Sequence, residues 1–120
     1  MDAARALADL TEISSQIREA ALVGPDGQLV AGSERVARAA QELLEAARGV
    51  RSEGSLTQAE ASTASGSLFV VRDGDRMVAA TTGPEPTVGL VFYDLKTCLR
   101  SIDPPKPKRR TTKKAADGEA

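Results

Sequence analysis

The sequence predicts an α/β fold of the α+β type: an αββαβββα sandwich with a five-stranded antiparallel sheet, one helix on one face and two on the other. Three observations support this prediction. Three segments repeat apolar residues at helical spacing, five shorter segments have strand character, and tight-turn sequences separate the strands. Because the helical segments stand at the beginning, middle and end, the strands fall into a group of two and a group of three.

The first helix and a hairpin account for the amino-terminal third. Residues 2–18 carry apolar side chains every three or four positions, and Asp2 favours the helix start. Residues 20–23 and 28–31 are short apolar runs on either side of the turn sequence Gly24-Pro25-Asp26-Gly27. This arrangement predicts two antiparallel strands.

The central helix, residues 33–50, has the longest unambiguous helical periodicity, with Ser33 as its cap and Gly49 near its end. Its apolar residues span about 180° of the helix, wider than the stripe of about 100° that packing on one surface needs. They are Val36, Ala37, Ala39, Ala40, Leu43, Leu44, Ala46, Ala47 and Val50. The polar arc carries Glu34, Arg35, Arg38, Gln41, Glu42, Glu45 and Arg48. That arc must face water or another protein.

Three strands and a last helix follow. Residues 55–63 form a polar strand that is weak as a core strand, whereas residues 67–72 form the strongest strand of the chain. Asp73-Gly74-Asp75 turns the chain into a third strand at residues 76–82. After the Gly83-Pro84-Glu85-Pro86 break, a helical face runs from Val88 to Ile102. The paired prolines at 104 and 105 close the domain.

Charge divides the chain into a domain, residues 1–103, and a basic tail, residues 104–120, which we expect to be disordered in isolation. The domain holds 15 acidic and 10 basic side chains, and the tail holds 2 acidic and 6 basic ones. The basic residues of the tail are Lys106, Lys108, Arg109, Arg110, Lys113 and Lys114. They suit nucleic acid phosphates, an anionic membrane surface, an acidic protein groove, or simple solubilisation.

Composition excludes several classes of function. The chain has no histidine and a single cysteine, Cys98, so it lacks the residues of a His-based catalytic site, a Cys-rich zinc site or an internal disulfide. No phosphate-binding loop or serine-hydrolase motif occurs. The Asp73-Gly74-Asp75 sequence lacks the later ligands of a calcium loop and is interpreted as a turn. We therefore expect no enzyme activity and no cofactor or metal.

The composition also bears on where the protein is located and on whether it binds nucleic acid. A free thiol, no signal peptide and no membrane span predict a cytoplasmic protein. Aromatic residues are only 2% of the chain, which weakens any function that needs stacking on bases. Nucleic acid is therefore disfavoured as a partner, although a nucleic-acid-associated dimer that uses the basic tail stays as an alternative.

The order of elements and their motifs resembles the roadblock/dynein light chain family, in particular its small bacterial members. The resemblance covers about residues 2–102. It is carried by AALVGPDGQLVAGS at 20–33, the alanine-rich helix after it, SLFVVRDGDRMVAATT at 67–82 and PTVGLVFYDLKTCL at 86–99. The family implies a dimer in which the strand near residues 56–62 pairs with its counterpart and the second helices lie side by side.

The resemblance implies a non-catalytic regulator or scaffold of a small Ras-like GTPase, acting as a homodimer, with a sensor kinase or other signalling protein as a further partner. The implied dimer interface is Ala37, Ala40, Leu44, Ala47, Leu56, Gln58 and Glu60. The implied partner-binding residues are Arg35, Arg38, Gln41, Glu42, Glu45 and Arg48. A plain dimeric interaction adaptor is the alternative, since the resemblance alone does not say whether a nucleotide cycle is altered. A strand-edge dimer also agrees with the weak strand at 55–63, because pairing removes an exposed edge.

Overall fold

The three helices and the five expected strands occur in the predicted order, and one further short strand lies between the second helix and the strand after it. The computed structural model describes residues 1–46, 51–53 and 56–102. Its elements are α1 (Ala3–Ile13), β1 (Ile17–Val23), β2 (Leu29–Gly32), α2 (Glu34–Ala46), β3 (Arg51–Glu53), β4 (Leu56–Thr63), β5 (Gly66–Asp73), β6 (Arg76–Thr82) and α3 (Val88–Ser101).

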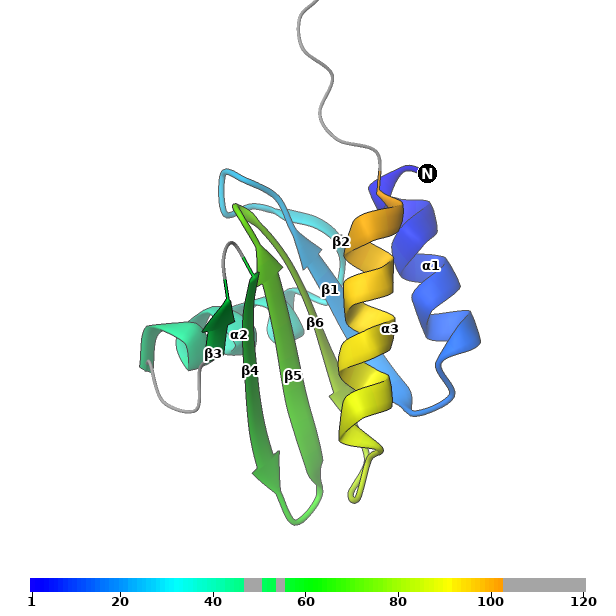
Figure 1. The fold of residues 1–120 in the computed structure, drawn as a ribbon, viewed down its shortest axis with the longest axis vertical. Helices are drawn as coiled ribbons and strands as arrows, with labels where there is room; N and C mark the ends of the chain where they lie inside the picture. The colour runs from blue at the N-terminus through cyan, green and yellow to red at the C-terminus, as the bar shows by residue number, and fades with distance from the viewer. Residues whose placement is uncertain (47–50, 54–55, 103–120) are drawn as a thin grey trace, which may run out of the picture.

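The strands form one antiparallel sheet in the order β2-β1-β6-β5-β4-β3. The helices α1 and α3 lie side by side on one face, and α2 crosses the other face (Figure 1). This layering confirms the predicted sandwich of one helix, a sheet and two helices. The amino terminus lies beside the carboxyl-terminal end of α3 (Figure 1).

All five expected strands are present, and the three-residue strand β3 extends the sheet beyond β4. The first helix is shorter than predicted. It ends at Ile13, where the Ser14 N–H donates to the Leu10 carbonyl, and Ile17 already belongs to β1. Ile17 continues the helical spacing of α1, but its side chain is buried as the first residue of a strand. The central helix is described only to Ala46, so residues 47–50 of the prediction lie outside the described part.

Successive side chains along each strand point to opposite faces of the sheet, and so the core has two layers. Toward α1 and α3 the sheet presents larger side chains, including Leu22, Phe69 and Val78. Toward α2 it presents mainly alanines and valines. None of the described helices is long and apolar enough to cross a lipid bilayer.

Candidate interaction surface

The position of α2 is fixed by the two residues in front of it. Gly32 has a φ of +96°, and a Cβ there would run into the Ala20 carbonyl oxygen and the Leu7 side chain. Ser33 then caps the helix, because its Oγ accepts the Val36 N–H at 3.3 Å. The side of α2 that faces water is therefore set where the helix begins.

The sheet surface beneath α2 is built from small side chains that stand opposite one another on neighbouring strands. One such row consists of Ala21, Ala79, Val70 and Ala59. Val36, Ala37 and Ala40 of α2 are buried in the same apolar cluster. Small residues on both sides let the helix lie close to the sheet.

Two residues of the predicted dimer interface are buried against their own sheet. Ala40 is fully buried and Ala37 is 6% exposed, both within their own subunit. Leu44 is half-buried at one flank of α2, and Ala47 lies outside the described residues.

The edge of β4 is open along only part of its length. β3 pairs with residues 56–58, with Arg51 opposite Gln58 and Glu53 opposite Leu56. This pairing corrects the expectation that the strand is unpaired from residue 56 onward. Residues 59–63, which we call the open half of β4, have no strand beside their outer edge within the described part of the chain. Glu60 belongs to the open half.

The structure brings five of the six predicted partner-binding residues onto the outer side of α2. Arg35 is ion-paired with Glu19 at 2.6 Å, and Arg38 with Glu34 at 3.3 Å. The Gln41 amide donates to the Gly27 carbonyl at 3.4 Å. Glu42 and Glu45 are also exposed, and neither makes an ion pair with another described residue. Arg48 lies outside the described residues.

A groove of about 450 Å³ runs along one flank of α2, above the end of the sheet where the β4–β5 hairpin turns. Its walls include Ala39 of α2, Ala61 and Thr63 of β4, and Leu68 of β5. Ala39 was not among the predicted contacts. It lies within the apolar arc of the helix, but a helical wheel does not show which flank adjoins the open half of β4.

The Asp73-Gly74-Asp75 sequence forms the predicted turn. Asp73 and Arg76 stand opposite each other as the last pair in the register of β5 and β6. Between them, Gly74 has a φ of +65° and Asp75 has no positive φ, as in a type II′ turn. Among the described residues, no three His, Cys, Asp or Glu side chains gather closely enough to hold a metal ion. The basic residues of the tail, Lys106 to Lys114, lie outside the described residues.

Comparison with known proteins gives a fold. No family model matches the chain, and no curated protein matches it. Two crystal structures of Roadblock/LC7 domains from Streptomyces avermitilis are similar. The first has a TM-score of 0.65 at 20% identity, covering 82% of this chain and 95% of that one. The second has a TM-score of 0.67 at 17% identity, covering 84% and 94%.

MglB from Myxococcus xanthus is also similar, with a TM-score of 0.57 at 16% identity, covering 80% of this chain and 87% of that one. Identities this low establish the fold alone. The order of elements, the layering of the helices and these structures agree, and the chain has the Roadblock/LC7 fold.

Proposed function

We propose that this protein is a non-catalytic regulator of a small Ras-like GTPase and acts as a homodimer. The observation that supports this proposal most directly is a juxtaposition. The helix α2, which carries the charged outer side, crosses the sheet from β1 to β4, and so it reaches the strand whose open half a second subunit would join. The class of partner is the one that the resemblance to the roadblock/dynein light chain family implies, and the Roadblock/LC7 fold agrees with that resemblance.

The dimer joins the open half of β4 to its counterpart, antiparallel across a two-fold axis. Ala61, Ser62 and Thr63 are exposed there, and pairing satisfies backbone groups that otherwise form an exposed edge. A second subunit that approaches this edge also approaches the groove lined by Ala39 and Ala61. We therefore place the seam between the two α2 helices on the flank of Ala39 and Leu43, which lie one helical turn apart.

The charged side chains of α2 can give up their ion pairs within the chain when another protein binds. The ion pairs of Arg35 and Arg38 join largely exposed side chains, and such pairs contribute only about 0–1 kcal/mol. Giving them up for contacts to a GTPase therefore costs little. The exposed carboxylates of Glu42 and Glu45 add negative charge to the same surface. Regulation requires that this surface bind one nucleotide state of the GTPase more tightly than the other.

The dimer is tested by Ala39→Arg, which places a charge on the half-buried flank of α2. We expect sedimentation velocity to show a dimer for the natural chain and a monomer for the variant, with unchanged circular dichroism. Ala8→Arg is the matched control, because Ala8 is exposed on α1, on the other face of the sheet. A variant that stays dimeric would remove the seam from this flank.

Regulation is tested with the small GTPase encoded nearest to this chain. We expect binding to differ by about tenfold or more between its GDP- and GTP-bound forms, a free-energy difference of about 1.4 kcal/mol. Glu42→Lys together with Glu45→Lys should weaken binding while the dimer persists. Equal affinity for both forms, with unchanged rates of hydrolysis and exchange, would instead identify a plain adaptor.

A further inference from the structure

A second surface lies on the face of the sheet opposite α2. The helices α1 and α3 run antiparallel, side by side (Figure 1). Their side chains line a cleft of about 210 Å³, which we call the α1/α3 cleft. It extends from Met1 and Ser101 at one end to Ile13 and Asp94 at the other. The remaining lining residues are Ala6, Asp9, Leu10, Thr97 and Cys98.

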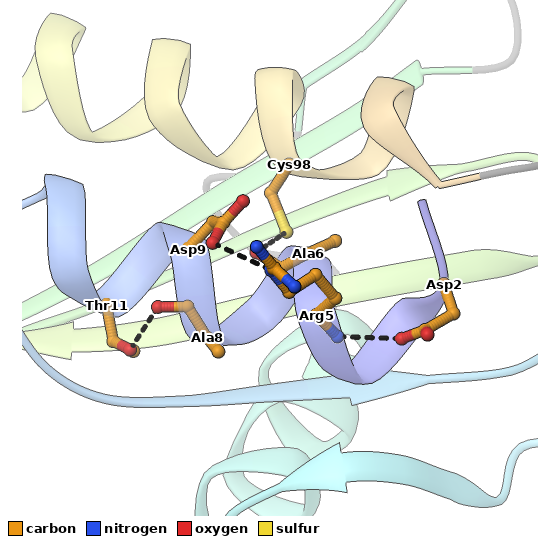
Figure 2. Close-up of polar contacts among 7 residues, drawn as sticks. All are labelled: Asp2, Arg5, Ala6, Ala8, Asp9, Thr11 and Cys98. Carbon is orange, nitrogen blue, oxygen red and sulfur yellow. Dashed lines mark hydrogen bonds and ion pairs between the residues drawn. The ribbon is translucent and has the colours of Figure 1, made fainter.

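The floor of the cleft is apolar. Ala6 and Leu10 are 2% and 5% exposed, and the Cys98 thiol donates to the Ala6 carbonyl at 3.6 Å (Figure 2). Burial, with a smaller effect of the Asp9 carboxylate, raises the pKa of Cys98 to about 11, so the thiol is uncharged at neutral pH. A group that enters the cleft therefore meets hydrocarbon and a protonated thiol whose hydrogen bond is already made.

Large apolar side chains continue the floor onto the surface. Ile13, which lines the cleft, is 76% exposed, and Leu90, one helical turn before Asp94, is 49% exposed. Single exposed apolar residues are normal on a protein surface. Here they adjoin an apolar cleft, and such a combination marks an interaction site.

The rim of the cleft carries two carboxylates, those of Asp9 and Asp94, as well as Met1. Asp9 forms an exposed ion pair with Arg5 at 3.5 Å, drawn in Figure 2. Asp94, on the opposite wall, makes no ion pair with any described residue. A partner with basic side chains around apolar ones is therefore complementary to the cleft.

Size and backbone chemistry restrict what fits. The cleft is smaller than the roughly 300–1,000 Å³ of a typical small-molecule site, so it suits one or two anchoring side chains of a larger partner. Its walls are helices, which present no open strand edge with unpaired N–H and C=O groups. An extended peptide would find no backbone partners there, whereas a helix brings its own hydrogen bonds.

We propose that the α1/α3 cleft binds an amphipathic helix of a second protein. The apolar side chains of that helix enter between Leu10, Ile13 and Cys98, and its lysines or arginines approach Asp9 and Asp94. Because the cleft and α2 lie on opposite faces of the sheet, the protein would join two partners at once (Figure 1). This proposal does not depend on a GTPase, and either one can fail while the other stands.

The probe is a fluorescein-labelled peptide of roughly 18 residues, with leucine at i, i+3, i+4 and i+7 and lysine elsewhere. Fluorescence anisotropy with the full chain should show binding that is about tenfold tighter than for a scrambled peptide of the same composition. Ile13→Lys and Asp94→Lys should each weaken binding about tenfold. Asp75→Lys is the control for charge, because it makes the same change in a turn distant from the cleft, and it should have little effect.

Equal binding of the scrambled peptide, or unchanged binding by Ile13→Lys and Asp94→Lys, would overturn the proposal. Two further outcomes would also overturn it, by assigning the cleft to another occupant. If Ile13→Lys alters self-association in sedimentation, the occupant is a second copy of this chain. If Arg109→Gln with Arg110→Gln tightens peptide binding, the occupant is the chain's own basic tail.

Discussion

The two faces of the sheet are built from alternate residues of the same strands, yet they differ in size and composition. Toward α1 and α3, Phe69 is fully buried and packs edge-on against Phe92, with ring centroids 5.1 Å apart and an interplanar angle of 80°. Toward α2, the neighbouring residue Val70 stands in a row with three alanines. We call the face toward α1 and α3, with its large side chains, the thick face, and the face toward α2, with its small side chains, the thin face.

This difference separates two tasks. Burying a large side chain contributes about 1.5–3 kcal/mol, so the thick face supplies most of the hydrophobic stabilisation. The thin face supplies less, but it allows α2 to lie close to the sheet while one flank of the helix stays accessible beside the groove of Ala39. We infer that the α1/α3 face mainly maintains the fold and that the α2 face mainly sets the spacing of an interface.

The largest expected effect is a large-to-small change on the thick face. Phe69→Ala should lower the free energy of unfolding by about 3–5 kcal/mol, because it leaves a cavity and removes the edge-on contact. Urea unfolding followed by circular dichroism measures the loss. Phe92→Ala, at a half-buried position, should cost less. A loss below 1 kcal/mol at Phe69 would contradict the assignment of the main core to this face.

The thin face should instead fail when a side chain is enlarged. Ala79 is fully buried between Ala21 and Val70, and Ala79→Leu should destabilise the protein by about 1–3 kcal/mol because α2 must move away from the sheet. Ala4→Leu, at an exposed position on α1, is the control and should be nearly neutral. A neutral or stabilising Ala79→Leu would show that the space beneath α2 is not closely filled.

Much of the fold followed from local patterns, and the errors have local causes. The strands β4, β5 and β6 were predictable because glycine-containing turns bracket runs with strand character. Ile17 was misassigned to the first helix, since its spacing from Leu10 and Ile13 suits a helix as well as a strand start. Strand β3 was missed because three polar residues, Arg51 to Glu53, have no periodicity to detect.

The candidate interface was less predictable, because it depends on how elements meet. The width of the apolar arc predicted that α2 contacts more than its own sheet, but a helical wheel places Ala39, Ala40 and Leu44 all within that arc and does not show which of them the sheet covers. In the structure the sheet covers Ala40, whereas Ala39 lines the groove. Likewise, the polar composition of β4 suggested an open edge, whereas the partial cover by β3 depends on the path of the chain between α2 and β4.

The smallest expected effect is a pH dependence of stability that arises from Cys98, a buried residue of the thick face. Its pKa is raised from 9.0 to about 11, mainly by burial and to a smaller extent by Asp9. Below pH 9 the thiol is protonated in both folded and unfolded chains, so its contribution to stability is constant. Between pH 9 and 11 the unfolded chain loses this proton first, and the free energy of unfolding therefore falls as pH rises. Relative to Cys98→Ala, the natural chain should lose about 1 kcal/mol between pH 8 and pH 10. Urea unfolding at the two pH values measures this difference, since all other titrating groups are common to both proteins. Parallel pH dependences of the two chains would show that the thiol ionises as readily in the folded protein as in water.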